Sequence, residues 1–353
     1  MIRVLVVDDS AVLRQSLQLI LESDVEMKVV GEAASGEEAI TLTKRLRPDV
    51  VTMDIRMPHM NGLDAIRYIM AECPVPIVVV TSLDLDQDGG ISVQAAKLGA
   101  LSILRRPASI DEPGYNTFTA RLIEQVKIMS DVKVVHRSRV DDHVPDLDDD
   151  QVKPTVQAGE MLLTQAIAIG ASTGGPAALH KVLSALPEDF GVPILVVQHI
   201  TFGFVDGLAE WLNDTCSLSV KVAEQGDAVR GGWVYLAPDD RHMQIDSQGH
   251  IVLIEEAAVN GHRPSITVLF ESLARAYGKT AMAILLTGMG ADGAAGMKLL
   301  REAGTTTIAQ DEKSCVVFGM PKEAITLGAV EHVVPLERIA QTMVALVHKP
   351  ADD

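Results

Sequence analysis

The sequence predicts an α/β protein with two doubly wound parallel-sheet domains. From Arg3 onward, short Val- and Ile-rich runs alternate with amphipathic segments, the pattern of a parallel sheet covered by helices. This alternation starts again near Leu163, and 353 residues are many for one domain. The run DDHVPDLDDD between the two blocks cannot bury apolar surface. We therefore expect domains at residues 1–130 and 161–350, joined by an acidic linker at 131–160.

The first block predicts a flavodoxin-like domain of five strands and five helices. Its helices include a segment at 35–46 that opens with a capping box of Ser35 and Glu38, and a last segment at 117–129. The expected strands are 3–9, 28–33, 49–55, 76–82 and 101–106.

The second block predicts a Rossmann-like domain that contains antiparallel hairpins. The hairpins are expected within 231–255, where turn residues at 238–240 and 247–249 interrupt the alternation of strands and helices. The other expected strands are 165–170, 193–199, 219–224, 281–288, 305–310 and 330–336.

The composition excludes several classes of partner and location. A formal net charge of −18 repels nucleic-acid phosphates and anionic membrane surfaces, so neither is an expected partner. We expect no signal peptide, because the first residues lack a long apolar region, and no run approaches a membrane span. The three cysteines, Cys73, Cys216 and Cys315, form no C-x-x-C pair, and we expect buried, unreactive thiols in a reducing compartment. These features indicate a cytoplasmic protein without membrane insertion.

Acidic residues follow the strands of the first block. Asp8 and Asp9 end the first strand, Asp54 ends the third, and Thr81 ends the fourth. The carboxyl ends of parallel strands meet at one edge of a doubly wound sheet, where ligands bind. Carboxylates crowded there repel one another unless a hard cation such as Mg²⁺ neutralises them. One carboxylate can then attack a phosphoryl group.

A glycine-rich turn at residues 170–175 follows the first strand of the second block. Ser172 lies on this turn, at the expected carboxyl edge of the sheet and just before a helical pattern. The run GASTG fits the G-x-S-x-G pattern of a nucleophile elbow, but a glycine-rich turn at a helix start can equally cradle a phosphate. A base and a carboxylate at the same edge favour the nucleophile.

His199 and Asp292 follow two other strands of this block. With Ser172 they are expected to form a hydrogen-bonded relay for acyl transfer to water, in which the imidazole accepts the serine proton and the carboxylate orients the imidazole. Taken singly, His199 also fits a structural histidine, and Asp292 fits a cap of the next helix. The chain order Ser, His, Asp differs from that of the α/β-hydrolases.

Residues 1–129 resemble the receiver domain of two-component response regulators. The matching segments are VDDS, DIRMPHMNG, Thr81 and GALSILRRP. The resemblance implies that a histidine kinase phosphorylates Asp54 and that Thr81 follows the phosphoryl group. It also implies that Mg²⁺ is held by Asp8, Asp9, Asp54 and the Arg56 carbonyl.

Two positions depart from the receiver pattern. Arg106 stands where receivers usually have a lysine, and Ile103 stands where many receivers carry a switching aromatic residue. Arginine keeps the positive charge, but its broad planar fork is not equivalent to a compact ammonium group. We therefore expect that Asp54 is phosphorylated but that the signal is relayed less effectively.

Residues 165–346 resemble the catalytic domain of chemotaxis protein-glutamate methylesterases. The resemblance implies hydrolysis of glutamate methyl esters on methyl-accepting chemotaxis receptors and deamidation of certain receptor glutamines, with no cofactor for hydrolysis. Ser172 would be the nucleophile, His199 the base and Asp292 its orienter, with Thr173 and the Met289 backbone beside the oxyanion. The matching segments are IGASTGGP, VVQHI, YLAPDDRHM, NGHRPSITVLF, LLTGMGADGAAG and TIAQDEKSCVVFGMP.

The resemblance also bears on two loops and on regulation. ITFGF follows His199 in place of the Met-Pro-Pro run that is frequent in the family. This loop borders the expected site, so its sequence is expected to affect which substrates are preferred. The segment HRPS at 262–265 can line the cleft, but we favour its role as a helix start. In the family the unphosphorylated receiver covers the hydrolase cleft, and phosphorylation loosens that contact.

Two other classes of function remain open from the sequence. The chain fits a response regulator with a non-enzymatic, protein-binding output, in which the serine has no chemical role. A DNA-binding regulator is disfavoured, because the C-terminal half has neither a basic patch nor an apparent helix-turn-helix.

Overall fold

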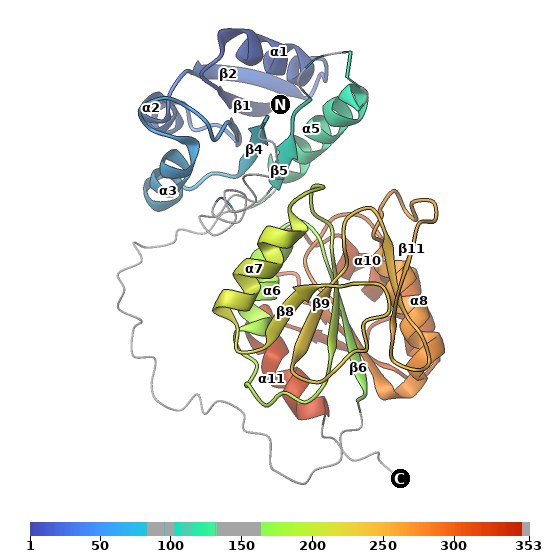
Figure 1. Ribbon diagram of the computed structural model, residues 1–353. Coiled ribbons are helices and arrows are strands. Elements are labelled where there is room, and N and C mark those ends of the chain that lie inside the picture. The colour runs from blue at the N-terminus through green and yellow to red at the C-terminus, as the bar shows by residue number, and fades with distance from the viewer. Residues whose placement is uncertain are drawn as a thin grey trace, which may run out of the picture. The chain divides into compact units, whose positions relative to one another are not determined.

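The computed structural model describes residues 1–82, 95, 102–107, 109, 111, 112, 114–130, 132 and 164–347 (Figure 1). The chain divides into two compact units, Met1–Leu147 and Asp148–Asp353. Apart from Val132, the expected linker at 131–160 lies outside the described residues, and so does the expected fourth helix of the first domain apart from Ala95.

A parallel five-stranded sheet forms the first unit, with the strand order β2-β1-β3-β4-β5. This order confirms the flavodoxin-like prediction. The strands are β1 (Ile2–Val7), β2 (Met27–Ala33), β3 (Val50–Met53), β4 (Ile77–Thr81) and β5 (Ser102–Arg105). The helices are α1 (Ala11–Glu22), α2 (Gly36–Leu46), α3 (Gly62–Glu72) and α5 (Tyr115–Ser130).

The helices of the first unit cover both faces of its sheet. Val4 and Val6 of β1 pack with side chains of α1 and α5, whereas Leu5 and Val7 pack with side chains of α2 and α3. Successive residues of a strand point to opposite faces, so β1 contributes to two apolar cores. The predicted cap is also present, since Ser35 accepts a hydrogen bond from the backbone N–H of Glu38 at 3.3 Å.

The second unit contains a parallel sheet of seven strands in the order β14-β13-β12-β6-β7-β9-β8. From the central strand β6 the chain first builds the side with β7, β8 and β9, and then the side with β12, β13 and β14. The strands are β6 (Ala166–Ala171), β7 (Ile194–Gln198), β8 (Ser219–Val222), β9 (Trp233–Leu236), β12 (Ala281–Leu285), β13 (Thr306–Gln310) and β14 (His332–Val334).

One part of the hairpin prediction is wrong. Only β10 (His242–Ile245) and β11 (Ile251–Ile254) form an antiparallel hairpin, around the predicted turn at 247–249. β9 instead pairs in parallel with both β7 and β8. Its run WVYL has three buried residues in succession, as expected of a strand covered on both faces. The residues 238–240 therefore connect two separate sheets.

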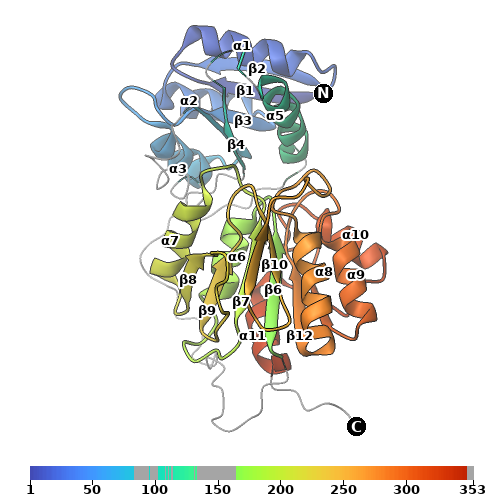
Figure 2. The ribbon, with the colours of Figure 1, turned by 45° about the vertical axis from the view of Figure 1, so that its right-hand side comes forward.

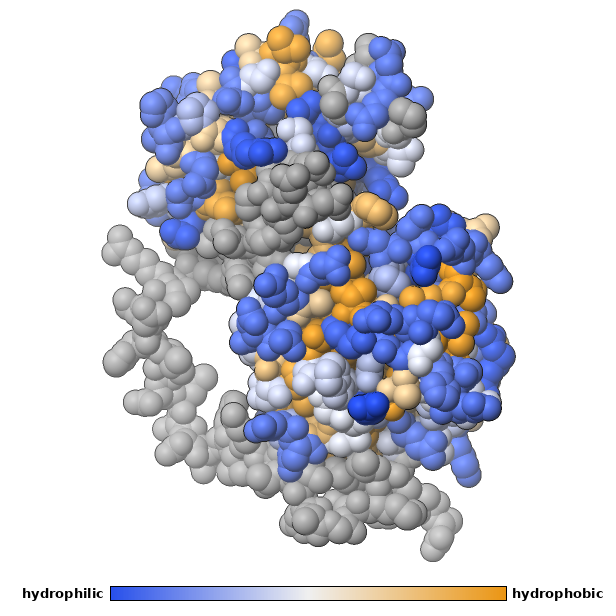
Figure 3. Space-filling model, in the orientation of Figure 1, coloured by the Kyte–Doolittle hydropathy of each residue, from blue (hydrophilic) through white to orange (hydrophobic). Residues whose placement is uncertain are grey.

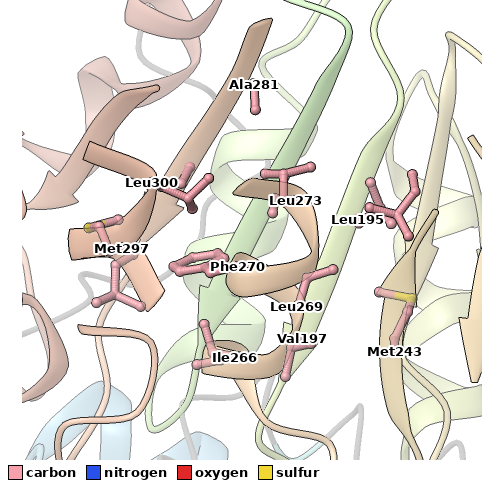
Figure 4. Close-up of a cluster of buried hydrophobic side chains, with 14 of the residues drawn as sticks. Leu195, Val197, Met243, Ile266, Leu269, Phe270, Leu273, Ala281, Met297 and Leu300 are labelled. Atoms are coloured by element: carbon pink, nitrogen blue, oxygen red, sulfur yellow. The ribbon is translucent and has the colours of Figure 1, made fainter. Parts of the chain in front are cut away.

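Helices also cover both faces of the second sheet (Figures 1 and 2). One face carries α6 (Gly175–Leu183), α7 (Val205–Thr215) and α11 (Leu336–Val347). The other carries α8 (Ile266–Tyr277), α9 (Ala294–Glu302), α10 (Met320–Thr326) and the hairpin. Phe270 of α8 lies in the centre of this second core, beside Met297 and Leu300 of α9 (Figure 4). This packing fixes α8 against the sheet.

The surface and the cysteines bear on the composition-based expectations. Hydrophilic side chains interleave with smaller hydrophobic areas on the view in Figure 3. No helix in the described parts of the chain has the length and apolarity to cross a membrane. The cysteines are free thiols but are half-buried, not fully buried as expected. Burial raises the pKa of Cys216 to about 11 and, with the charge of Asp311, that of Cys315 to about 12.

Candidate active site

Ser172 lies on a tight turn between β6 and α6, as the sequence predicts. Its backbone N–H donates to the Thr287 carbonyl at 3.0 Å, and its carbonyl accepts from Gly175 N–H at 2.8 Å. Gly174 has a φ of +76°, and a Cβ added there would lie 2.6 Å from the Cβ of Val316. Glycine is therefore required at this position, both for the conformation and for the close approach. The turn leaves Ser172 half-buried.

The strands that carry Ser172 and His199 are direct neighbours. Ala171 pairs with Gln198, and the backbone N–H of His199 donates to the Ala171 carbonyl at 2.9 Å. On the other side of β6, Leu286 N–H donates to the Gly170 carbonyl at 2.8 Å. The loops after β6, β7 and β12 therefore start at the same edge of the sheet.

His199 and Asp292 form a buried hydrogen-bonded pair. Nε2 of His199 lies 3.0 Å from Oδ2 of Asp292, and the side chains are 7% and 1% exposed. Nδ1 of His199 is buried and has no hydrogen-bond partner among the described residues. Nor do the hydrogen bonds of this part of the chain include one between the ring and the Ser172 hydroxyl. The structure thus joins the predicted base and carboxylate, and it places the predicted nucleophile at the neighbouring strand end.

The Asp292 carboxylate binds at the N-terminus of α8. Burial alone would raise its pKa, but hydrogen bonds from His199, Thr267 and the N–H of Ile266 hold this pKa well below its usual range. Its side chain does not cap α9, the alternative role that its position in the sequence allowed, since the N-cap of α9 is Gly293 without a side-chain hydrogen bond. Besides His199, the donors are Ser265 Oγ, Ile266 N, Thr267 N, Thr267 Oγ1 and Asn260 Nδ2.

The segment HRPS begins a helix and also contacts the candidate site. Ser265 is the N-cap residue of α8, in agreement with the favoured prediction. Its hydroxyl, however, donates to Oδ1 of Asp292 at 2.8 Å. The His262 ring stacks on the His199 ring with centroids 3.7 Å apart and 4° between the planes. The preference for the helix start alone therefore missed these contacts.

The loop after β12 packs against the Ser172 turn. A Cβ added at Gly288 would lie 2.6 Å from the Cβ of Ser172, so the backbone just before Met289 contacts the predicted nucleophile. Thr173 is 9% exposed, and its carbonyl accepts from the Thr287 hydroxyl at 3.0 Å. The roles of Thr173 and the Met289 backbone beside an oxyanion stay predictions.

The loop after His199 displays an aromatic side chain. Phe202 is 61% exposed, whereas Phe204 is buried. Between them, Gly203 N–H donates to Oδ2 of Asp239 at 2.7 Å, which ties this loop to the segment after β9. The segment ITFGF thus has its backbone tied to Asp239, and its exposed phenyl ring belongs to the third residue after His199.

A second polar cluster lies in the first unit. One carboxylate oxygen from each of Asp8, Asp9 and Asp54 lies within 4.8 Å of the others. β1 and β3 are paired, with Val7 opposite Met53, and this register places the aspartates together. Burial, followed by the charge of Asp8, raises the pKa of Asp54 to about 6. The structure therefore confirms the predicted proximity of the acidic residues.

The predicted switch residues lie at the ends of two neighbouring strands, Thr81 as the last residue of β4 and Arg106 just after β5. Thr81 ends β4 and is buried, and its carbonyl accepts from Arg106 N–H at 2.8 Å. Nη1 of Arg106 donates to the Pro107 carbonyl at 3.2 Å. Burial raises the pKa of Asp8, and the charge of Arg106 is among the influences that oppose this rise. The positive charge of Arg106 thus favours the ionised form of Asp8.

A serine beside a buried imidazole–carboxylate pair, on an α/β fold, is the arrangement of serine hydrolases. Two family descriptions match the chain, the response regulator receiver domain at residues 4–112 and the CheB methylesterase at residues 167–343. The chain belongs to the CheB methylesterase family and carries a receiver domain at its N-terminal side.

Relatives match this chain over nearly their full lengths. A protein-glutamate methylesterase/protein-glutamine glutaminase of Nitrosospira multiformis is 46% identical over 98% of this chain and 97% of its own. One of the same name from Salmonella typhimurium is 41% identical, over 98% and 97%. The crystal structure of the Thermotoga maritima CheB methylesterase catalytic domain is 40% identical, with a TM-score of 0.51, and the match covers 52% of this chain and 99% of that domain.

Proposed function

We propose that this protein hydrolyses glutamate methyl esters on methyl-accepting chemotaxis receptors and deamidates certain receptor glutamines, in the cytoplasm. The hydrogen bond of 3.0 Å between His199 and Asp292, one strand from Ser172, carries this proposal. The shared name of the full-length relatives supports both activities. Ser172, His199 and Asp292 are the proposed catalytic residues.

The proposed reaction has two acyl-transfer steps. The Ser172 hydroxyl attacks the ester carbonyl and passes its proton to His199, and methanol leaves with that proton. Water then attacks the acyl-enzyme, again with His199 as the base, and yields the glutamate carboxylate and free Ser172. With a glutamine side chain, ammonia replaces methanol as the leaving group. Thr173 and the N–H of Met289 are the proposed neighbours of the oxyanion.

Receptor membranes with labelled methyl esters provide the direct test. Intact protein, with and without a phosphodonor, is expected to release labelled methanol into the supernatant. Mass spectrometry of receptor peptides is expected to show conversion of specific glutamines to glutamate. If membranes that a known methylesterase demethylates release no methanol in either condition, the proposed activity is wrong.

We also propose that the receiver regulates this hydrolysis. The three adjacent carboxylates, and the raised pKa that burial and then the charge of Asp8 give Asp54, fit a hard divalent cation with oxygen ligands. Asp8, Asp9, Asp54 and the Arg56 carbonyl would hold Mg²⁺, which would offset negative charge during phosphoryl transfer. A histidine kinase would phosphorylate Asp54, and the phosphorylated receiver would release the hydrolase from inhibition.

Asp54→Asn is expected to abolish the response to a phosphodonor. The amide cannot act as a nucleophile, so neither the mass increase of one phosphoryl group nor the rise in methanol release should occur. Asp64→Asn is the matched control, because its carboxylate is exposed on α3 and pairs with Arg67. A full activity response in Asp54→Asn would exclude this residue as the regulatory phosphorylation site.

Arg106→Lys is expected to increase activation by the receiver. A compact ammonium group can approach the phosphoryl oxygens where the broader guanidinium donates to Pro107. At equal phosphorylation of Asp54, methanol release should rise about fivefold over that of the native protein. Arg105→Lys, an exposed neighbour on β5, is the control. Unchanged activation in Arg106→Lys would show that this position does not limit the relay.

A further inference from the structure

We propose that Thr267 is a positioning residue for the hydrolysis, because its hydroxyl fixes both the Asp292 carboxylate and the loop that carries it. This inference rests on the proposed function of Ser172, His199 and Asp292. Thr267 lies in the first turn of α8, 25 positions before Asp292 in the chain, and is 5% exposed.

The direction of the Thr267 hydroxyl is determined by its neighbours. Oγ1 lies 2.8 Å from the Gly293 nitrogen and 3.4 Å from Nδ2 of Asn260, both of which donate to it. It also lies 2.7 Å from Oδ1 of Asp292. A hydroxyl has one proton and two acceptor positions. The two N–H donors occupy the acceptor positions, so the proton points to Asp292.

The two oxygens of Asp292 have different partners. Oδ1 accepts from both groups of Thr267, from the Ser265 hydroxyl and from Asn260. Oδ2 accepts from Ile266 N–H at 2.8 Å and lies 3.0 Å from Nε2 of His199. Hydrogen bonds to a carboxylate are charge-assisted, and α8 presents its positive dipole end here. The contacts at Oδ1 therefore orient the carboxylate so that Oδ2 faces the imidazole.

The Thr267 hydroxyl donates to Asp292 and also accepts a hydrogen bond from the loop after β12. The donor in this loop is Gly293 N–H. Gly293 has a φ of +86°, and a Cβ added there would lie 2.6 Å from Cγ2 of Ile266 in α8. The other end of this loop packs on Ser172 through Gly288. Thus one hydroxyl of α8 anchors the carboxylate within a loop that also contacts the predicted nucleophile. The other hydroxyl donor, Ser265, has no such bond to the loop backbone among the described residues.

Thr267→Val removes the hydroxyl and keeps the shape of the side chain. The carboxylate and its loop then lose a shared anchor, and His199 is oriented less well. We expect kcat for methanol release to fall about 10- to 100-fold with little change in KM, because a small misplacement of reacting groups affects the chemical step. Thr267→Ser restores the hydroxyl and is expected to recover most of kcat.

Ser272→Ala is the matched control on the same helix. Ser272 is 2% exposed, and its hydroxyl bonds Leu269 and Ile245, away from Asp292. Its loss should lower thermal stability without a specific loss of kcat. If native protein is active and Thr267→Val keeps the kcat of Ser272→Ala, the role of Thr267 is overturned. Inactive native protein would instead overturn the proposed function itself.

A second readout needs no substrate and separates the two proposals further. In protein with ¹⁵N-labelled histidine, the proton between His199 and Asp292 is expected to exchange faster with water in Thr267→Val than in Ser272→Ala. If Thr267→Val does not fold, Thr267→Ala takes its place, since it also removes the hydroxyl that donates to Oδ1. Native exchange rates and native kcat in that variant would contradict the inference.

Discussion

Ser172→Ala is expected to reduce kcat for methanol release by on the order of 10⁴-fold or more. A methyl side chain cannot form the acyl-enzyme. Only the rate acceleration that the remaining groups of the site provide would persist. The substitution removes one oxygen from a half-buried turn whose backbone bonds to Thr287 and Gly175 stay intact. Stability should therefore change little, which thermal unfolding can check.

The control for this substitution is Ser184→Ala, at the C-terminal end of the helix that follows the turn. Its activity should equal that of the native protein. Receptor binding by Ser172→Ala should also be preserved, so that the loss lies in kcat. Retention of native methanol release by Ser172→Ala would favour a response regulator whose output is protein binding and not ester hydrolysis.

Asp292→Asn is expected to lower kcat by about 10⁴-fold. An amide can donate where the carboxylate accepted, and it then no longer selects the imidazole tautomer that receives the serine proton. Stability should also fall, because buried donors of Ser265, Ile266 and Thr267 lose an anionic acceptor. Each donor left without a partner costs about 1–3 kcal/mol. Methanol release and urea unfolding measure the two effects separately.

The pH dependence of that stability difference has a defined sign. A carboxyl whose folded pKa lies below its unfolded value of about 3.9 stabilises the protein above the unfolded pKa, and this effect disappears as pH falls through the folded pKa. The pKa of Asp292 is held well below its usual range. The stability gap between native protein and Asp292→Asn should therefore narrow as pH falls below about 4.

The aspartate control is Asp246→Asn in the hairpin turn. Asp246 accepts hydrogen bonds from Gln248 and His250 but is exposed and lies in another part of the catalytic unit. Its kcat should be native. Equal kcat for Asp292→Asn and Asp246→Asn would remove Asp292 from the proposed relay, whatever their stabilities.

The sequence predicted those parts of the sites that depend on strand ends. Parallel strands bring their carboxyl ends together, so Asp8 and Asp54, or His199 and Asp292, could be expected near one another from their positions after apolar runs. Both of these expected proximities occur in the structure. The serine turn was predictable because glycines and Pro176 mark the change from strand to helix.

The contacts of α8 were not predictable in the same way. Asn260, Ser265 and Thr267 reach Asp292 through tertiary packing across 25 to 32 positions of sequence. Their residue types also suit caps and turns, so local patterns give no reason to place them beside a carboxylate. The position of β9 was missed for a related reason, since turn residues after Leu236 suggest a hairpin while the sheet packing selects a parallel neighbour.

The central place of β6 determines when the reactive centre can exist during synthesis. Ser172 and His199 leave the ribosome on adjacent strands, but the acid is 93 positions further along the chain than the imidazole. It reaches them only after β12 has docked on the opposite flank of β6. A nascent chain that ends before this strand therefore lacks part of the proposed catalytic site, and ester hydrolysis is expected only after the chain has been translated beyond Asp292.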